Sequence, residues 1–424
     1  MLNEDAPLQA NRRTSVVLSC PVSTFPVDRE PSRLNPTPVA LRVIAFAPNA
    51  WGESWMNRQQ ILSRLAKRHH ILYSNGPWTV WDVHRPEFRA SKSGGGFERH
   101  DGVLLDQSPK LLLSWPTNPA WDLLTIPLAV ERWRRQLKKM GDGPIVAYVF
   151  HPSYVKYVER MRADLVVYSP YDLFSSMPDW SVEKEADEQR LIDLSGLVIT
   201  SSEPTRNAIQ QKTAKPVFCV PNAADASLFE AGSELPPPPD VASIPRPRIG
   251  YVGTLNRKVN FPLVLNIALS EPTWQFLFIG PDGNFDDVTH AAMDQCRQLP
   301  NVHFLPAKSV AELPMCMGAL DVAMMCYRKD TWMDFGYPLK LHEYLASGTP
   351  IVSTPLQSIG DFKDWIETAD DEQSWRAAIA RALNGHARST AEDRRAVARR
   401  NTWDARVDTI EGILTTAVDG KLEQ

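Results

Sequence analysis

Short apolar segments alternate with amphipathic ones along most of this chain, and that alternation constrains the fold more than any other feature. Residues 41–47 and 70–73 have the composition of buried strands, and between them Ile61, Leu62 and Leu65 give a helix one apolar face. A strand, a loop, a helix and a second strand begin a doubly wound parallel sheet. The sequence therefore predicts an α/β protein whose ligand sites lie beyond the carboxyl ends of its strands.

A proline-rich segment divides this pattern in two. It includes four consecutive prolines at 236–239, a composition typical of a stiff, extended linker. The 424 residues are enough for two domains, so we expect two doubly wound, Rossmann-like domains facing a central cleft. The expected divisions are a disordered extension at 1–38, a first domain at 39–230, the linker at 231–247, a second domain at 248–395 and a C-terminal helix at 396–424.

The composition argues against several classes of protein. Hydrophobic residues make up 43% of the chain, and the net charge of −4 does not suggest a nucleic-acid partner. The five cysteines lack the spacing of a metal site, which favours free thiols in a reducing compartment. The first 15 residues lack the apolar core of a signal peptide, and no apolar run approaches the ~20 residues of a membrane helix. We expect a cytoplasmic protein, free or peripheral on the inner face of the membrane.

A short helix is predicted at 339–346, late in the chain. Pro338 stands where a first-turn proline is tolerated. Gly348 marks the end of the helix, and Pro350 prevents it from resuming. A buried strand is predicted directly afterwards, at 351–353.

The first turn of this helix combines features that suit an anion. Its N–H groups and positive dipole end favour phosphate, and Lys340 adds a full charge. Glu343, one turn later, is placed to accept hydrogen bonds from sugar hydroxyls. An ordinary amphipathic helix with a surface Lys–Glu pair gives the same pattern, and the sequence leaves both interpretations open.

A second phosphate-type loop is predicted at the start of the second domain. A strand beginning at Arg248 runs into a tight turn at Gly253, where the backbone can approach a ligand closely. Arg257 and Lys258 follow and provide positive charge for a diphosphate, without a choice between them. Simple turn chemistry is the alternative.

Two polar side chains follow predicted strands of the first domain. His151 comes after the strand 144–150, and Asp172 comes shortly after the strand 165–168. Both strand ends should open on the same cleft, where an aspartate or a histidine can act as a general base. The alternatives are a capping Asp172 before a turn and a His151 bonded to a backbone carbonyl.

The loop after the first strand should face the same cleft. Its candidates for binding an acceptor are Gly52, Glu53, Trp55 and Arg58. Tryptophan faces stack on sugars, although a packing role for the loop is equally open.

These motifs resemble a known family. The run Pro-Leu-Lys-Leu-His-Glu-Tyr-Leu-Ala-Ser-Gly-Thr-Pro-Ile-Val, 338–352, is similar to the donor-binding segment of GT-B nucleotide-sugar glycosyltransferases, most of all the bacterial ones that build polysaccharides. The resemblance implies that Lys340 and the amides near Pro338 and Leu339 hold the donor diphosphate, and that Glu343 binds the ribose. Many retaining members carry another glutamate, eight residues before the position of Glu343. Phe335 occupies that position here, with Asp334 beside it.

The resemblance also implies an activity. The second domain would bind a nucleoside-diphosphate sugar, a UDP-sugar being favoured, and the first a glycan or lipid-linked acceptor whose hydroxyl receives the sugar in polysaccharide biosynthesis. The C-terminal helix would cross back to the first domain. No metal and no cofactor beyond the sugar nucleotide is expected. The alternatives are a nucleotide-sugar 2-epimerase of the same fold and a non-catalytic sugar-nucleotide-binding protein.

One further segment, 111–140, suggests an anionic membrane surface as a partner. It ends in a basic amphipathic helix, a type that can lie among lipid headgroups. A packed aromatic core beneath a solvated charged face is the alternative. Its aromatic and basic residues are Trp115, Trp121, Trp133, Arg132, Arg134, Arg135, Lys138 and Lys139.

Overall fold

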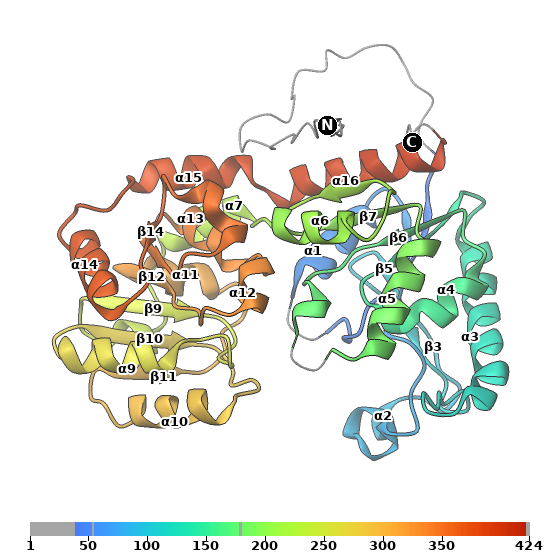
Figure 1. The fold of residues 1–424 in the computed structure, drawn as a ribbon, viewed down its shortest axis with the longest axis horizontal. Helices are drawn as coiled ribbons and strands as arrows, with labels where there is room; N and C mark the ends of the chain where they lie inside the picture. Colours follow the sequence, from blue (N-terminus) through green and yellow to red (C-terminus); the bar gives the residue numbers. More distant parts are fainter. Residues whose placement is uncertain (1–38, 53–54, 178–179, 421–424) are drawn as a thin grey trace, which may run out of the picture. The chain divides into compact units, whose positions relative to one another are not determined.

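A computed structural model describes residues 39–52, 55–177 and 180–420 (Figure 1). The predicted extension at 1–38 and the candidate Glu53 lie outside the described residues. All described residues belong to one unit of the chain, residues 37–424.

The first sheet has eight strands in the order β3-β4-β2-β1-β5-β6-β7-β8. All neighbouring strands are parallel except β3 and β4, which form an antiparallel hairpin. At the centre, Arg42 pairs with His70 on one side and with Ile145 on the other. The strands are β1 Arg42–Phe46, β2 His70–Ser74, β3 Gly96–His100, β4 Val103–Gln107, β5 Ile145–Val149, β6 Leu165–Tyr168, β7 Leu197–Thr200 and β8 Val217–Cys219.

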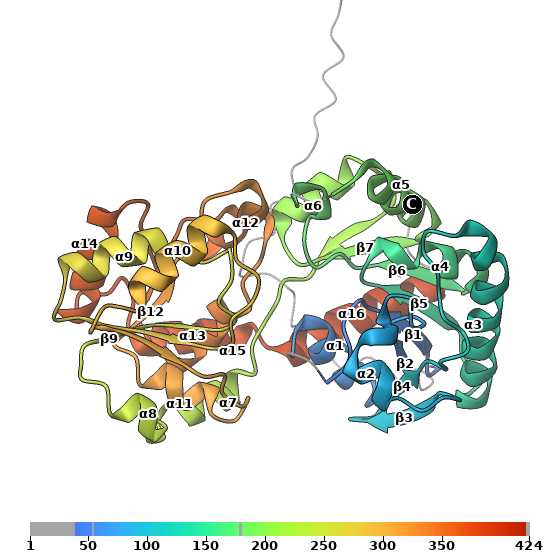
Figure 2. The ribbon, with the colours of Figure 1, turned by 90° about the horizontal axis from the view of Figure 1, so that it is seen from below.

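Helices cover both faces of this sheet. The helices of this half are α1 Asn57–Leu65, α2 Pro86–Ala90, α3 Pro119–Met140, α4 Val155–Met161, α5 Val182–Leu194 and α6 Glu203–Gln210, with short 3-10 turns at Asp82–His84, Pro152–Tyr154 and Phe174–Ser176. The next helix, α7 Ala226–Ser233, packs into the core of the second sheet instead. Figures 1 and 2 show α3, α4 and α5 on one face, where Trp133, Val158 and Ile192 enter the core. Leu62 of α1 packs into the core of the other face. The apolar stripe seen in the sequence is therefore the buried side of α1.

The second sheet has six strands, all parallel, in the order β11-β10-β9-β12-β13-β14. The strands are β9 Arg248–Val252, β10 Gln275–Ile279, β11 Val302–Leu305, β12 Val322–Met325, β13 Ile351–Ser353 and β14 Glu367–Thr368. The helices are α8 Pro239–Ala242, α9 Phe261–Ser270, α10 Asp287–Cys296, α11 Leu313–Gly318, α12 Thr331–Phe335, α13 Lys340–Ser347, α14 Glu372–Leu383, α15 Ala391–Arg400 and α16 Trp403–Val418, with a 3-10 turn at Gln357–Phe362. With two parallel sheets and helices between their strands, the α/β fold class predicted from the sequence is confirmed.

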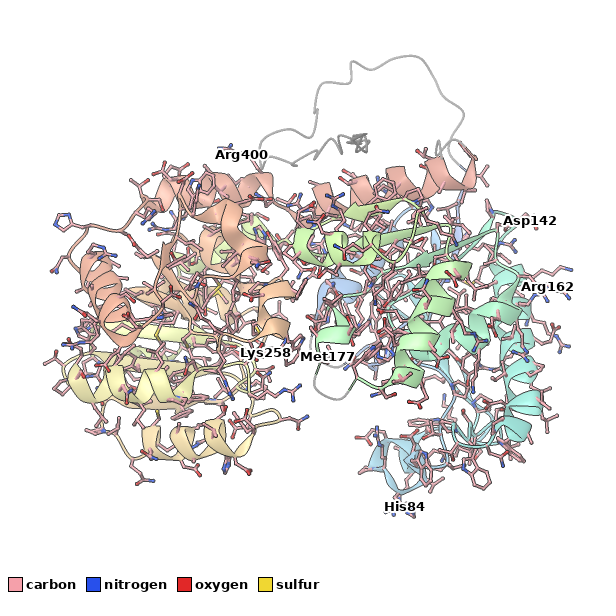
Figure 3. All side chains as sticks on the ribbon, viewed as in Figure 1. His84, Asp142, Arg162, Met177, Lys258 and Arg400 are labelled. Atoms are coloured by element: carbon pink, nitrogen blue, oxygen red, sulfur yellow. The ribbon has the colours of Figure 1, made fainter. Side chains whose placement is uncertain are left out.

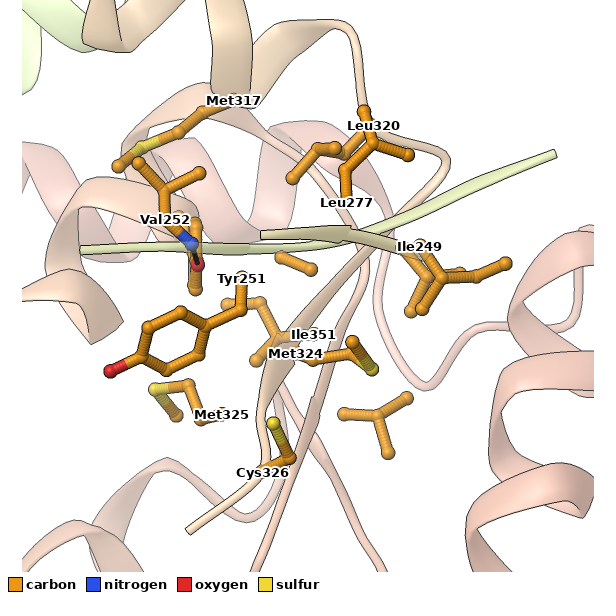
Figure 4. Packing of buried hydrophobic residues seen from close by; sticks show 14 of the residues in the cluster. Ile249, Tyr251, Val252, Leu277, Met317, Leu320, Met324, Met325, Cys326 and Ile351 are labelled. Atoms are coloured by element: carbon orange, nitrogen blue, oxygen red, sulfur yellow. Dashed lines mark hydrogen bonds between the residues drawn. The ribbon is translucent and has the colours of Figure 1, made fainter. Parts of the chain in front are cut away.

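The core of the second sheet alternates strictly along β9. Figure 4 shows Tyr251 on the same side of the strand as Met325, while Val252 points to the opposite side, toward Met317. Successive side chains of a strand point to opposite faces. Tyr251, at the carboxyl end of β9, thus presents its ring to the loops that follow the strands.

Two segments differ in detail from the sequence prediction. The segment predicted as an extended linker contains the helical turn α8, and its Val241 and Ile244 are buried in the second core. The prediction of an extended chain is wrong there, because these two apolar side chains dock the segment onto the second domain. The C-terminal helices are interrupted near Gly385 and again before Thr402, whose hydroxyl caps α16.

The last helix packs on the first sheet rather than on the second. Trp403, Val407, Ile410 and Leu414 of α16 belong to the core that includes Leu62. Within the described part of the chain, no helix is long and apolar enough to cross a bilayer.

Candidate active site

A cavity of about 570 Å³ lies beyond the carboxyl ends of strands from both sheets. From the first sheet come the loops after β1 and β6, and from the second the loops after β9, β10 and β12. This is the expected place for a ligand in doubly wound sheets. Its lining includes Trp55, Met56, Asn57, Tyr171, Asp172 and Asn222 from one side, and Gly253, Lys258, Gly280, Tyr327, Pro338, Leu339, Lys340 and Glu343 from the other.

Lys340 begins helix α13 and points into this cavity between two tyrosine rings. Its Nζ lies 3.5 Å from the centroid of the Tyr251 ring and 5.4 Å from that of Tyr327. Among the described residues it forms no ion pair. Burial lowers the pKa of Lys340 to about 7. An ammonium that lies over tyrosine rings in the cavity, with no ion pair among the described residues, is well placed to take up an anionic ligand.

Glu343 lies one helical turn after Lys340 and lines the same cavity. Burial raises the pKa of Glu343 to about 7, against the opposing effect of the Lys340 charge. Hydrogen bonds from a ligand to a carboxylate favour its charged form. A pair of sugar hydroxyls is a suitable partner for it.

Two glycines keep the backbone close to Lys340. Gly253 has φ of +136°, and a Cβ built on it would lie 3.0 Å from the Lys340 Nζ. A Cβ on Gly280 would lie 2.3 Å from the carbonyl oxygen of Gly253. Both loops therefore need glycine. Gly253 adopts a conformation that other residues rarely adopt and leaves space for Lys340, and Gly280 allows its loop to approach the Gly253 backbone closely.

Lys258 and Arg257 are distinguished by the structure. Both cations lie over the Trp332 ring, at 3.8 Å for the Nζ of Lys258 and 4.8 Å for the Arg257 guanidinium. Lys258, labelled in Figure 3, lines the cavity, whereas Arg257 is not among its lining residues. Asn256 accepts a hydrogen bond from the Lys258 backbone N–H, at 3.0 Å, and so fixes the loop. The geometry favours Lys258 as the second cation of the site.

Asp172 reaches the cavity from the loop after β6. Burial raises its pKa, and the charge of Lys258 acts in the opposite direction. A carboxylate of the first sheet is thereby combined with a lysine of the second at one cavity.

His151 is placed differently. At the end of β5 its Nδ1 accepts a hydrogen bond from the Ser153 backbone N–H, at 3.2 Å, and its ring packs against Phe174. Burial lowers its pKa to about 4, so the ring is neutral at pH 7. His151 does not line the described cavity, and the structure does not bring it together with Asp172 there.

The predicted acceptor loop is only partly in the cavity wall. Trp55 lines the cavity and is 41% exposed, and its ring packs edge-on against the buried Trp51. Gly52 does not line the cavity, and Arg58 is 1% exposed behind its wall. The two tryptophans of this loop therefore differ in role: Trp51 packs in the core, and Trp55 faces the cavity.

Several lining residues escaped the sequence analysis. Asn222 of the first domain lines the cavity and donates to the Tyr337 carbonyl oxygen, at 2.8 Å. Phe335, named in the sequence analysis, does not line the cavity, and its carbonyl oxygen accepts a hydrogen bond from the Ser202 hydroxyl at 2.7 Å. The signal for Asn222 was its place in the loop that follows strand β8.

The comparisons with known proteins fit this geometry. Residues 246–385 match the model of the family described as Glycosyl transferases group 1. This stretch is similar to the group 1 glycosyltransferases. It contains Gly253, Lys258, Lys340 and Glu343, so the second-domain side of the cavity lies within the family's own region.

A relative shares sequence beyond this domain. The putative teichuronic acid biosynthesis glycosyltransferase TuaH of Bacillus subtilis is 27% identical over 226 residues, which are 51% of this chain. The match covers 56% of that protein, so the chain spans about half of the length of this relative.

Solved structures resemble nearly the whole chain. A sucrose-phosphate synthase of Thermosynechococcus elongatus matches 90% of it, with a TM-score of 0.67 and 14% identity, over 100% of its own length. An Anabaena protein, HepE, in complex with UDP and glucose matches 88% with a TM-score of 0.62 and 13% identity, over 99% of its length. At these identities the likeness shows the fold alone, and that fold is GT-B.

Proposed function

We propose that this protein transfers a sugar from a nucleoside-diphosphate sugar, with a UDP-sugar favoured, to a hydroxyl of a glycan or lipid-linked acceptor in polysaccharide biosynthesis. One observation carries the proposal. Lys258 and Lys340 line one cavity without an ion pair among the described residues, and the Lys258 charge lowers the pKa of Lys340 after the larger effect of burial. Two mutually repelling cations at a glycine-rich backbone suit a diphosphate.

The chemistry of transfer fits these residues. The bond between the anomeric carbon and the diphosphate breaks, and its electron pair leaves with the diphosphate, whose growing charge the two lysines stabilise. A new bond forms to the acceptor oxygen. The hydroxyl proton of the acceptor passes to Asp172, whose raised pKa is appropriate for a general base. In this proposal the sugar nucleotide is the co-substrate and no further cofactor takes part.

Two alternatives considered from the sequence are less favoured. A 2-epimerase of the same fold would need no acceptor, and a binding protein would release no product. The matching family and the relative from Bacillus subtilis are both described as glycosyltransferases. Neither the epimerase nor the binding protein is favoured by these descriptions.

Product analysis distinguishes a transferase from an epimerase and from a binding protein. The purified full chain is incubated with labelled UDP-sugars, with and without a lipid and glycan extract, beside its Lys340→Met variant. We expect labelled glycan or lipid only with the extract and only with the unmodified chain. Labelled product that forms equally without an acceptor would contradict transfer and support epimerase chemistry.

The acceptor-side domain also carries a surface suited to a membrane. We define the apolar patch as the exposed side chains before and along the first half of α3, where Leu124 is 59% and Leu123 is 71% exposed. The exposed side of the helix then becomes basic, at Lys138 and Lys139. The members of the patch are Leu111, Trp115, Trp121, Leu123, Leu124 and Leu128.

Two residues of the sequence-based version of this idea are structural instead. Trp133 is 1% exposed, and its indole N–H donates to Asp106 at 2.6 Å. Arg132 forms an ion pair with the same buried carboxylate. The membrane contact we propose is therefore made by the apolar patch, with the basic end of α3 beside it, on an anionic headgroup layer.

Vesicle co-sedimentation tests this contact. Each exposed basic residue contributes ~1 kcal/mol near an anionic surface, so Lys138→Glu with Lys139→Glu should lower binding to phosphatidylglycerol-containing vesicles by more than about tenfold. Leu124→Gln with Leu128→Gln should lower it too. Leu269→Gln with Val288→Gln, exposed apolar residues of the other domain, are the matched control and should change nothing. Binding that is insensitive to all four changes would contradict the contact.

A further inference from the structure

Arg58 is a buried cation without a counterion in the described residues. It stands in the first turn of α1 and is 1% exposed. It forms no ion pair there, and its Nε has no hydrogen-bond partner there either. Buried charges in proteins are normally paired, because an unpaired one is costly. The described residues therefore leave this guanidinium with unused capacity to bind an anion.

The guanidinium turns back toward the start of its own helix. Its Nη2 lies 3.2 Å from the sulfur of Met56, the N-cap residue of α1, and its centre lies 5.6 Å from the Tyr171 ring. Met56 and Tyr171 both line the cavity. A thioether is a weak acceptor on a flexible side chain, so a ligand oxygen could replace it.

The start of α1 lacks the usual acceptors as well. Its first turn has no acidic residue, and its N-cap is a methionine rather than a serine, threonine, aspartate or asparagine. Gln59, the next residue, is fully buried, and its Nε2 has no partner within the described part of the chain, while its Oε1 accepts from the Met56 N–H at 3.1 Å. A guanidinium Nε that has no partner among the described residues thus lies at a helix N-terminus without an acidic residue in its first turn, beside two residues that line the cavity.

This place is on the acceptor side of the cavity. Tyr171, beside Arg58, directly precedes Asp172 in the chain, whereas Lys258 and Lys340 belong to the other domain. An oxyanion held at Arg58 would place the rest of its molecule next to the proposed base.

We propose that the acceptor is anionic and that Arg58, with the donors at the start of α1, binds its phosphate or carboxylate group. The inference rests on the proposed function, since it names the class of acceptor for the same cavity. Met56 moves aside when the oxyanion binds.

The test uses the full chain with its donor side filled by UDP, so that the lysines do not bind the probe. Inorganic phosphate and glucuronate are then titrated separately by calorimetry, which distinguishes a phosphate-bearing from a uronate-bearing acceptor. The variants are Arg58→Gln and Arg58→Lys. Arg64→Gln is the matched control, an arginine of the same helix that is paired with Asp404 at 3.1 Å.

We expect phosphate or glucuronate to bind the UDP-loaded chain, Arg58→Gln to weaken that binding by about tenfold or more, and Arg58→Lys to weaken it less, because hydrogen bonds to charged groups are the stronger ones. UDP affinity should stay unchanged in all three variants. A melting temperature measured without ligand checks folding, and it should not fall in Arg58→Gln, because no described ion pair is lost.

Failure of this inference and failure of the proposed function are distinguishable. Normal UDP binding with no binding of either probe, or equal probe binding by Arg58→Gln, would overturn the assignment of Arg58 alone. A chain that does not bind UDP would overturn the proposed function. A large loss of melting temperature in Arg58→Gln would show that the guanidinium is structural and would also overturn the assignment.

Discussion

At the scale of single residues, the ionisation of Lys340 has a measurable consequence. Its pKa of about 7, lowered by burial, means that the ammonium loses its proton as the pH rises through neutrality. A diphosphate binds the protonated form, so UDP affinity should be highest below pH 7 and fall above it, by at most about tenfold per pH unit. Calorimetry over this pH range, in buffers of different ionisation enthalpy, should also show proton uptake on binding.

Glu343 must be separated from this effect, because its own pKa is about 7 and its carboxylate forms over the same range. In Glu343→Gln the fall in affinity above pH 7 should remain. In Lys340→Met it should disappear, together with the proton uptake. A fall that persists without Lys340 would assign the titration to another group.

Asp172 carries the second prediction at this scale. Asp172→Asn keeps the shape of the side chain but removes its basicity, so turnover should drop by ~10²–10⁴ while UDP affinity changes little. Steady-state kinetics with saturating donor measures the first and calorimetry the second. Asp334→Asn, which alters a carboxylate outside the cavity lining, is the control. Near-normal turnover of Asp172→Asn would exclude it as the base.

At the scale of elements, the site depends on loops that approach closely after β9 and β10. Gly253→Ala would add a Cβ 3.0 Å from the Lys340 Nζ at a backbone φ of +136°. We expect weaker UDP binding together with a loss of stability of roughly 1 kcal/mol or more, because alanine is strained in this conformation. Calorimetry and urea unfolding measure the two effects.

Gly412→Ala is the matched control for that change. Gly412 lies within α16, and a Cβ there would meet nothing within 4 Å. Alanine should leave UDP affinity unchanged and stabilise the chain by roughly 0.5–1 kcal/mol, since glycine is unfavourable inside a helix. Equal effects of the two substitutions would contradict a special role of the β9 loop.

At the scale of the whole molecule, local patterns predicted the two sheets well. Most strands are short apolar runs, such as 41–47, which is followed by Pro48 and Asn49, and this pattern is visible without a structure. The hairpin strand β3, Gly96–His100, was not predicted, because Phe97 is its only apolar side chain and the three residues after it are exposed. The linker was predicted to be extended because prolines dominate it, and the docking of Val241 depends on a core formed by distant residues.

The site was predictable only as far as local motifs reach. Lys340 and Glu343 follow from one helix start, and both line the cavity. The choice of Lys258 over Arg257 depends on which of the two neighbouring side chains lines the cavity, and only the tertiary structure gives that. The isolation of Arg58 depends on which carboxylates the fold brings near it, and that is a property of tertiary structure.

The central claim is that the cavity binds the diphosphate of a sugar nucleotide through Lys258 and Lys340. Titration of UDP into the full chain and into Lys258→Met and Lys340→Met tests it most directly, with Arg257→Met as the neighbouring control. The account predicts one UDP site, an affinity about tenfold or more weaker in each cavity-lysine variant, and a smaller change in Arg257→Met. Unchanged UDP affinity in both cavity-lysine variants, with melting temperatures preserved, would contradict the account.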